Sequence, residues 1–412
     1  MSEVIVYLND YKYAGNGFYE TIFLDFRTND DYEGFVRELN LARTTGSFLQ
    51  IDGYHSQKHL IPDSYYALNI GMLKQLQPTI NQESLLIGYK YDFSNYEGDN
   101  TVASNLLESH DALDPSELYS SHHQPITEIG FQGQQFSNTE LWVNNVGQAN
   151  WNEIRQDGAV KIVYDIGAPT NASRTQVRWY INQFFTQYQT DQPDLVLSHW
   201  DQDHYHCLLE MTDMELACFS RFICVDGMKS KTSKELYNRM ERVLGKSSIF
   251  CLVPEVRTSH SRYPQMHEKF SKIDFGLYAG EASRKRNYSG LVLYVQGNAA
   301  HALLTGDSLL CQVDDILQLL HRQGKLKNCH HITNDHFLVV PHHGGDIGPS
   351  FKSYHIPACI NAKEAIISVD ENDSLAKMYN HPSKKRRDFL KGVANWSIVR
   401  TDKEPQPIHR PL

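Results

Sequence analysis

The sequence predicts a mixed fold of the α/β (α+β) class in a chain of 412 residues, which is more than a single hydrophobic core usually organises. Two observations support this class. From Leu141 onward, short apolar runs typical of strands alternate with stretches whose apolar residues recur at helical spacing. Several of these runs end directly in a group of polar side chains. We therefore expect two units, an N-terminal accessory region over residues 1–135 and a second domain over residues 136–412.

The N-terminal region contains predicted elements of its own. Residues 5–8 and 22–26 are apolar like strands, and residues 31–39 follow a helical pattern. Residues 94–137 are rich in Asn, Ser, Asp, Glu and Gln, which predicts a linker or an extended loop. His122 and His123 lie in this segment. An exposed pair of histidines in a polar loop is more often solvated than bound to a metal. The pattern indicates no function for the region, which leaves it as a candidate surface for a protein partner.

The second domain begins with a predicted strand–helix–strand unit. The strands are expected at residues 161–165 and 195–198, and the helix at residues 175–185. Further strands are expected at residues 291–295, 302–304, 337–340 and 365–369, and a further helix at residues 312–323. Polar motifs follow these elements. Because ligand sites in such folds form where strands end at one sheet edge, we expect the polar loops to assemble one site.

Composition and charge favour a cytoplasmic enzyme. No window approaches the ~20 apolar residues of a membrane helix, and the polar start Met1-Ser2-Glu3 lacks a signal-peptide pattern, so no membrane association is expected. The seven cysteines are scattered, which indicates neither a disulfide framework nor a zinc finger. The formal net charge of −10 gives no global attraction to nucleic acid, so local patches or bound metal ions would have to draw a polyanion.

The densest group of potential metal ligands lies in residues 198–204, directly after an apolar run. It contains His199, Asp201, Asp203 and His204. Imidazoles and carboxylates are standard ligands of divalent metals, and side chains at i and i+2 of an extended segment point the same way. His199 and Asp201 would then share one metal, while Asp203 and His204 turn toward a second. The alternative is a polar loop with a capping Asp.

This HxDxDH spacing resembles the second motif of the metallo-β-lactamase fold, whose usual form is HxHxDH. Its middle Asp is similar to the ComEC-like branch, typified by the hydrolase domain of a DNA-uptake protein. Further short matches follow in the order of the family over about residues 141–400, and independent matches multiply in specificity. They are residues 145–150 (D-V-G-Q-G-D in the family), 163–167 (L-x-D-x-G), 287–293 (N-x-x-S-L-V-L), 303–307 (L-L-T-G-D), 340–345 (V-P-H-H-G-S), and 367–369 with His381-Pro382 (S-V-G and H-P).

The resemblance implies an αββα metallo-β-lactamase sandwich, two sheets face to face with helices outside, and two divalent metal ions at one rim. Asp307 follows a predicted buried strand and a Gly that permits a sharp turn, and it is the expected bridging carboxylate. A site richer in carboxylate than imidazole leads us to expect manganese or magnesium at least as much as zinc. The complete set of expected metal ligands is His199, Asp201, Asp203, His204, Asp307 and His381.

Three histidines outside the HxDxDH stretch have expected roles. His342 and His343 are adjacent, so they cannot both point at one metal from an extended strand. We expect one to coordinate or to donate a proton to the leaving group and the other to pack or orient it; with Asp203 they are the candidate catalytic residues. His381 precedes Pro382, and the resemblance implies a site role, although a residue next to a Pro-initiated helix explains the pair equally well.

Two basic runs are candidate substrate contacts. Lys384, Lys385 and Arg386, followed by Arg387, open a predicted helix near His381 and could steer a polyanion toward the metals. Residues 284–286 form a second run. The alternative for either run is a solvated helix or loop face.

The sequence departs from the family pattern in three places. Tyr205-His206-Cys207 replaces two glycines and is expected to narrow or reshape the entrance of the site. Asn145 stands where the family has an Asp, which leaves Asp165 as the nearest acid. Many enzymes of this fold place a lone histidine before the bridging Asp, and the candidates here are His206, His260 and His267.

The predicted function is a metal-dependent hydrolase that cleaves a phosphodiester, such as single-stranded nucleic acid or a nucleotide, with a metal-bound hydroxide. The residues indicate the metallohydrolase class, and the resemblance adds the preference for a phosphodiesterase or nuclease. The sequence contains no G-x-S-x-G motif and no cysteine with an obvious base beside it, so a protein nucleophile is not indicated. The alternatives are an ester, lactone or thioester hydrolase on the same scaffold, and a degenerate binding module without turnover.

Overall fold

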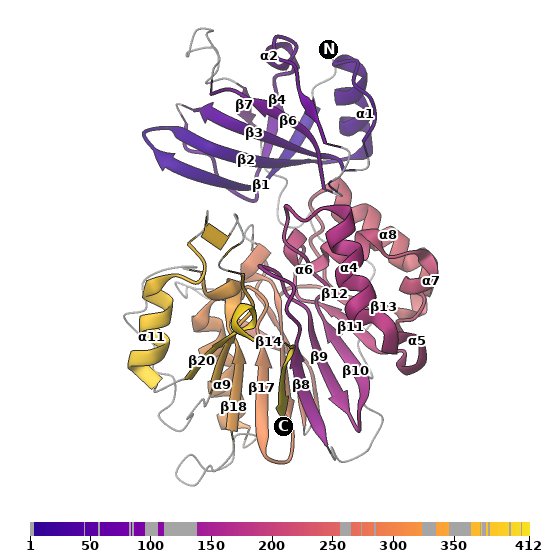
Figure 1. Cartoon of the computed structure of the whole chain (residues 1–412), viewed down its shortest axis with the longest axis vertical. Coiled ribbons are helices and arrows are strands. Elements are labelled where there is room, and N and C mark those ends of the chain that lie inside the picture. Colours follow the sequence, from indigo (N-terminus) through magenta and orange to yellow (C-terminus); the bar gives the residue numbers. More distant parts are fainter. Residues whose placement is uncertain are drawn as a thin grey trace. The chain divides into compact units, whose positions relative to one another are not determined.

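The computed structural model of the chain (Figure 1) describes residues 4–44, 46–56, 58–81, 84, 86–94, 106–110, 138–255, 265–272, 274–283, 286–323, 335–345, 364–370, 372, 376–377, 380–394, 397–404 and 406–412. The chain divides into two compact units. The first comprises Met1–Leu118, Thr170–Val177 and Gly227–Arg239, and the second comprises Tyr119–Pro169, Arg178–Asp226 and Met240–Leu412. The expected boundary at residue 135 and the pair His122 and His123 lie outside the described residues.

The first unit contains a seven-stranded sheet in the order β5-β6-β3-β2-β1-β4-β7. Its strands are β1 (Val4–Gly15), β2 (Phe18–Phe26), β3 (Phe48–His55), β4 (Tyr65–Leu68), β5 (Thr79–Ile80), β6 (Ile87–Asp92) and β7 (Leu107–Ser109), and its helices include α1 (Asn29–Glu38) and α2 (Ile70–Leu73). Alternate residues of β1, such as Val4, Val6 and Leu8, pack into one core with Phe35 of α1. The predicted strands at 5–8 and 22–26 and the predicted helix at 31–39 are therefore confirmed.

The second unit contains two further seven-stranded sheets. The first has the order β13-β12-β11-β10-β9-β8-β21, and β10 to β13 run parallel. All four residues of β11 are buried, as expected for a parallel strand covered on both faces. The strands are β8 (Thr139–Val143), β9 (Asn152–Gln156), β10 (Ala159–Tyr164), β11 (Asp194–Leu197), β12 (Arg221–Val225), β13 (Ile249–Leu252) and β21 (Ile408–Pro411).

The other sheet has the order β14-β15-β16-β17-β18-β19-β20, and β17 to β20 run parallel. Its strands are β14 (Met266–Lys272), β15 (Phe275–Gly280), β16 (Leu291–Gln296), β17 (Ala300–Leu304), β18 (Asp335–Val339), β19 (Glu364–Ile367) and β20 (Ser397–Arg400). The helix α9 (Leu310–Arg322) has apolar residues at helical spacing, and Val313, Ile316 and Leu320 pack into the core of this sheet. Leu390 of α11 (Lys384–Ala394) joins the same core.

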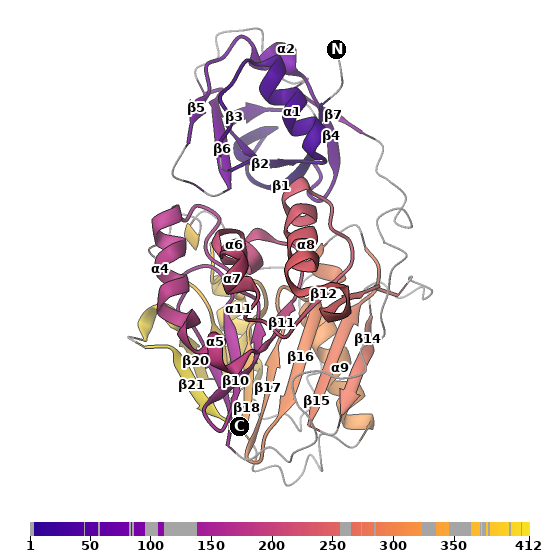
Figure 2. The ribbon, with the colours of Figure 1, turned by 90° about the vertical axis from the view of Figure 1, so that its right-hand side faces the viewer.

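The two sheets of the second unit pack face to face. The Tyr164 hydroxyl at the end of β10 donates to the Leu291 carbonyl of β16 at 2.6 Å, and Leu291 N donates to the Ser198 carbonyl at 2.8 Å. Figure 1 shows α11 outside one sheet, and Figures 1 and 2 show α5 (Tyr188–Asp191) beside β10 of the other. The αββα sandwich is therefore confirmed.

The elements predicted within residues 136–412 agree with the structure apart from their ends. The predicted strands are found as β10, β11, β16, β17, β18 and β19, and the predicted helices as α4 (Arg174–Phe184) and α9. None of the described helices combines the length and the apolar character that a membrane span requires. Strands β10, β11, β17, β18 and β19 each end immediately before a polar segment, and these segments form the site described next.

Candidate metal centre

The HxDxDH stretch begins after β11 and continues into the helix α6 (Gln202–Glu210). The chain is extended only before this helix, and Asp203 and His204, which were expected to turn toward a second metal, lie in its first turn. Asp201 occupies the position before the helix but makes no cap hydrogen bond with its side chain. Its Oδ2 instead lies 3.2 Å from Nε2 of His199, so the two side chains are neighbours, and their sharing of a metal stays a prediction.

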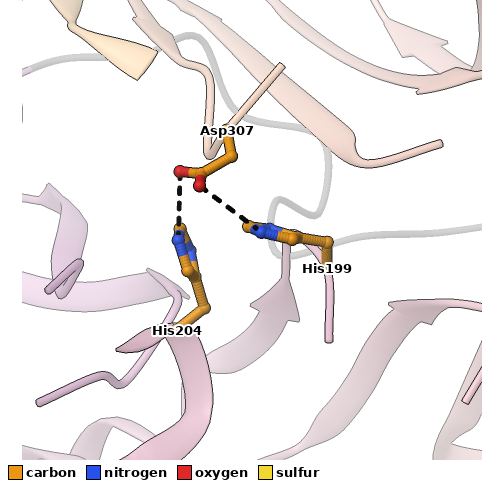
Figure 3. A group of neighbouring side chains, drawn as sticks. All are labelled: His199, His204 and Asp307. Atoms are coloured by element: carbon orange, nitrogen blue, oxygen red, sulfur yellow. Dashed lines mark ion pairs between the residues drawn. The ribbon is translucent and has the colours of Figure 1, made fainter. Parts of the chain in front are cut away.

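His199, His204 and Asp307, which we call the first ligand group, converge from three segments (Figure 3). Nε2 of His204 lies 3.1 Å from Oδ1 of Asp307, and Nε2 of His199 lies 3.7 Å from its Oδ2. Asp307 reaches this position because Gly306 turns the chain with a φ of +51°. A Cβ at Gly306 would stand 2.7 Å from the Ser198 side chain, so only glycine fits the turn.

Asp203, His204 and His343 form a second ligand group. Nε2 of His343 lies 3.0 Å from Oδ2 of Asp203, and Nε2 of His204 lies 3.9 Å from its Oδ1. The two groups share His204, so the structure brings His199, Asp203, His204, Asp307 and His343 to one place.

The other ring nitrogen of each of these histidines is fixed by a hydrogen bond. Nδ1 of His204 donates to Oδ2 of Asp165 at 2.8 Å, and Nδ1 of His343 donates to the Ser368 carbonyl at 2.8 Å. Ser198 Oγ donates to Asp165 at 2.9 Å, so it accepts from Nδ1 of His199 at 3.0 Å. A neutral imidazole that donates from Nδ1 has a lone pair on Nε2. The Nε2 lone pairs of all three histidines therefore face carboxylates, and an ionised carboxylate, like a lone pair, can only accept a hydrogen bond.

Such acceptor-to-acceptor contacts require a proton or a cation between them. Within the described part of the chain, Nε2 of His199, Nε2 of His204 and Oδ1 of Asp307 are buried and make no hydrogen bond. Imidazole and carboxylate ligands whose second nitrogen is held by a carboxylate or a carbonyl are typical of divalent metal sites. The donor set and its unsatisfied buried atoms fit metal ions.

Without a metal, protons must compensate the buried charge. Burial works against the charged form of His204, but Asp165, Asp307 and Asp203 outweigh it and raise the pKa of this imidazole well above its ordinary value. Burial also opposes ionisation of Asp307, but His342 and His204 outweigh it and hold the pKa of the carboxyl well below its usual range. The site thus concentrates negative charge that a cation can neutralise.

His342 and His343 point to different partners, as their adjacency suggested. Both have a left-handed backbone, with φ of +51°, in the turn after β18. Nδ1 of His342 donates to Oδ2 of Asp307, whereas His343 meets Asp203. The His342 side chain is 31% exposed and that of His343 only 1%, so His342 alone of the pair is accessible from solvent.

His381 lies next to the histidine pair but in neither ligand group. Its ring packs edge-on against that of His342, with ring centroids 4.9 Å apart, and Nδ1 contacts Nε2 of Gln148 at 3.0 Å. It lines a groove of about 770 Å³ with His342 and the start of α11. The other lining residues are Asn380, Ser383, Lys384, Lys385 and Asp388.

The basic run of α11 does not form one uniform face. Lys384 and Lys385 are exposed and line the groove, and their role as substrate contacts stays a prediction. Arg386 is only 1% exposed, and its Nε and Nη2 donate to the Gly345 carbonyl at 3.1 and 2.9 Å. Its expected role as a direct substrate contact therefore does not agree with its burial, and it holds the turn after β18 instead. The run at 284–286 has no described side chains.

Tyr205, His206 and Cys207 do not shape an entrance. All three are fully buried in α6, because the helix packs against residues 166–169. Nδ1 of His206 donates to the Pro169 carbonyl at 3.0 Å, and burial lowers the pKa of His206 to about 4. The expectation of a narrowed entrance is corrected, since the glycines are replaced by core residues.

His267, another candidate for a lone histidine, does not join the site. His267 pairs with Glu255 and Glu281 on the β14–β15 side of its sheet, at 3.2 and 3.6 Å. His260 lies outside the described residues. Ser198, Gln148 and Ser368, which the sequence analysis did not single out, contact the site histidines. All three lie in or next to the short motifs named in the sequence analysis, and this position was the only sign in the sequence that they belong to the site.

The sequence matches no protein-family model and no curated protein sequence. Similar solved structures include the short form of human tRNase Z, at 12% identity and a TM-score of 0.35, covering 64% of this chain and 91% of that chain. A variant of the β-hydroxylase CmlA has 12% identity and a TM-score of 0.37, covering 68% of this chain and 55% of that chain. CmlA itself, a diiron β-hydroxylase from Streptomyces venezuelae, has 12% identity and a TM-score of 0.35, covering 77% of this chain and 58% of that chain. These likenesses are distant, and the sandwich described above rests on the strand order of this chain.

Proposed function

We propose that this protein is a metal-dependent hydrolase that cleaves phosphodiester bonds, on a site of the ComEC-like type within the metallo-β-lactamase fold. The observation that carries the proposal is the convergence of three imidazole Nε2 lone pairs on the carboxylates of Asp203 and Asp307. The HxDxDH spacing supports the choice of branch.

Two divalent ions, manganese, magnesium or zinc, would occupy the two ligand groups. Nε2 of His204 has one lone pair and would hold one ion only, and Asp203 and Asp307 would both contribute carboxylate oxygens to the site. Asp201, beside His199, adds a carboxylate to the first ligand group. When bound, such ions supply a water of lowered pKa and neutralise charge on the group under attack.

The protein's own residues hold this arrangement and receive the substrate. Asp165 and the Ser368 carbonyl fix the ring orientation of His204 and His343. His342, which donates to Asp307 and reaches the groove, orients the expected bridging carboxylate. These contacts pre-organise the acceptors before substrate arrives, which is how a rigid site lowers an activation barrier.

The groove beside the site favours a phosphodiester over a carboxylic ester. Lys384 and Lys385 place two cations on its wall, against one carboxylate, Asp388. An anionic substrate gains from these cations, whereas a neutral ester or lactone does not. Because the overall charge is −10, a polyanion would need such a local excess of cations to be attracted.

The test begins with the metal content of the purified protein. The same sample is then assayed with bis(p-nitrophenyl) phosphate, a single-stranded oligonucleotide and a carboxylic ester, with Mn²⁺, Mg²⁺ or Zn²⁺ added back. We expect about two metals per chain and metal-dependent phosphodiester cleavage. Asp203→Ala should lose metal and activity with an unchanged circular dichroism spectrum, while Asp213→Ala, in the first turn of a neighbouring helix, should keep both. Cleavage of the ester alone, or a protein that binds no metal, would refute the proposal.

A further inference from the structure

Gln148 and His381 form a pair beside the groove, outside both ligand groups. Nε2 of Gln148 lies 3.0 Å from Nδ1 of His381. Gln148 is only 6% exposed, and its Oε1 is buried without a hydrogen-bond donor in the described part of the chain. The two residues are 233 positions apart, so the fold and not local sequence brings them together.

The amide of Gln148 can present either its nitrogen or its oxygen to His381, and hydrogen-bond satisfaction favours the nitrogen. With Nε2 toward His381, one buried acceptor, Oε1, lacks a partner. With the amide turned over, the NH₂ group and its two donors would take the enclosed position of Oε1. Two unsatisfied buried donors cost more than one unsatisfied acceptor.

A hydrogen bond from Gln148 makes Nδ1 of His381 an acceptor, so the neutral ring carries its proton on Nε2. This is the reverse of His204 and His343, which donate from Nδ1 and keep a lone pair on Nε2. A nitrogen that carries a proton cannot coordinate a metal. His381 lines the groove together with Lys384 and Lys385, where an anionic group would sit.

The turn after β18 is shaped to admit this ring. A Cβ on Gly345 would stand 2.3 Å from Nε2 of His381 and 2.5 Å from Cδ2 of His342. Arg386 holds the Gly345 carbonyl with two hydrogen bonds, so the turn that admits the ring is itself fixed. Nδ1 of His381 is thus held by Gln148, and the absence of a side chain at Gly345 leaves room for the Nε2 edge of the ring.

We infer that Gln148 is a positioning residue that keeps the His381 proton on Nε2, so that His381 donates a hydrogen bond to a phosphoryl oxygen in the groove and is not a metal ligand. The nature of the substrate in this inference rests on the proposed function. The role of His381 as a donor differs from the metal-ligand role expected from the sequence resemblance.

The proton position is tested by nitrogen NMR on protein labelled with ¹⁵N-histidine and loaded with diamagnetic Zn²⁺ or Mg²⁺. The His381 signals are assigned from their loss in His381→Gln. We expect protonated Nε2 and unprotonated Nδ1 in the wild type, and protonation of Nδ1 in Gln148→Glu, whose carboxylate can only accept. Gln318→Glu, at an exposed position of α9, is the matched control and should leave the signals unchanged. A wild-type ring protonated on Nδ1 overturns the inference.

Metal content and kinetics complete the test. Metal content should be unchanged in Gln148→Glu, His381→Gln and His381→Ala, and loss of one equivalent in His381→Ala would show a ligand and overturn the inference. The kcat for the phosphodiester reporter should fall roughly tenfold in Gln148→Glu. His381→Gln, which offers an amide donor in place of Nε2, should retain more activity than His381→Ala. The spectra and metal content need no turnover, so they decide the role of Gln148 even if an absence of phosphodiester cleavage has refuted the proposed function.

Discussion

At the scale of single residues, the site depends on which nitrogen of each histidine carries the proton. His199, His204 and His343 donate from Nδ1 to Ser198, Asp165 and Ser368, and so expose a lone pair. The types and spacing of the potential ligands could be read from the sequence, because HxDxDH and the Asp of the L-L-T-G-D segment are dense local signals. The hydrogen-bond partners of these histidines could not be read from the sequence, because each partner lies on another segment of the fold or is a common residue type.

Asp165 is the clearest case, and its substitution gives the first prediction. Asp165→Asn replaces an acceptor of three hydrogen bonds, from Ser198 N, Ser198 Oγ and His204 Nδ1, with a group that can no longer accept them all. We expect metal affinity to fall about 10–100-fold, as is typical when the partner of a ligating histidine is removed. Competition with a chromogenic chelator measures it.

The control for this variant is Asp157→Asn. Asp157 also has a left-handed backbone, with φ of +51° against +60° for Asp165, but it lies in the exposed turn between β9 and β10. Both variants remove one carboxylate at a position where Asn is well tolerated. Equal metal affinity of the two variants would argue against the role of Asp165.

At the scale of elements, helical periodicity explains two differences between expectation and structure. Residues 201–204 have no apolar periodicity, so the start of α6 was not recognisable, although Leu208 further on is buried. Lys384, Lys385 and Arg386 were all expected to contact substrate, yet Arg386 lies one turn before the buried Leu390 and shares its inward face. The burial of Arg386 could be predicted only from the apolar pattern of the whole helix, and not from the basic run alone.

Gly345 tests whether the turn after β18 positions the groove residues. Its φ of −66° suits any residue, so Gly345→Ala acts through the added Cβ alone, which would overlap His381 and His342. We expect the free energy of unfolding to fall by about 1–3 kcal/mol, as for other overpacked sites. Activity should fall by more than tenfold, because displacement of catalytic groups is costly.

Urea unfolding and steady-state kinetics measure the two effects. Gly34→Ala is the control, because an added Cβ there meets its nearest atom at 3.6 Å, in ordinary contact. It lies within α1, where alanine is the better helix former by about 1 kcal/mol. Full activity of Gly345→Ala would show that the turn tolerates the extra atom and that His381 and His342 need no such fit.

The exposed lysines of α11 give a prediction about capture of substrate. Replacement of both Lys384 and Lys385 by Ala should raise KM for a single-stranded oligonucleotide several-fold at low salt and leave kcat nearly unchanged, since neither touches a ligand group. The difference should shrink as salt is raised, because exposed charges are screened over roughly 10 Å at 0.1 M. A double replacement of Lys246 and Lys391, with the same change of net charge away from the groove lining, should show no such salt dependence.

At the scale of the whole molecule, the class of fold could be predicted because each buried parallel strand is an apolar run that ends in polar residues. Which segments make up the first unit could not be predicted. Thr170–Val177 and Gly227–Arg239 group with it through contacts that leave no hydropathy signal in the sequence. Thr232 N donates to the buried carboxylate of Asp25 at 3.2 Å, and the Tyr65 hydroxyl donates to the Lys229 carbonyl at 2.7 Å. Such single polar contacts between residues far apart in the chain become visible only in the folded structure.

The same balance of buried charge predicts how stability depends on pH and metal. In the metal-free protein, the raised pKa of His204 and His342 means that their contribution is complete below the unfolded value near 6.5 and is lost as pH rises through the folded pKa. Four other histidines have pKa values lowered chiefly by desolvation and act in the opposite sense, destabilising the fold as pH falls below about 6.5. They are His206, His301, His336 and His381.

We therefore expect the Tm of the metal-free protein to be highest near neutral pH and to fall on both sides. Bound divalent metal should remove most of the fall at alkaline pH, because the ions take the place of the protons between His204 and the carboxylates. The acid side should remain, since metal ligands are themselves protonated there. Differential scanning calorimetry between pH 5 and 9, with and without metal, measures both limbs. A metal-free Tm that keeps rising to pH 9 would mean that the buried carboxylates do not hold protons on these histidines, and the charge balance proposed for the site would be wrong.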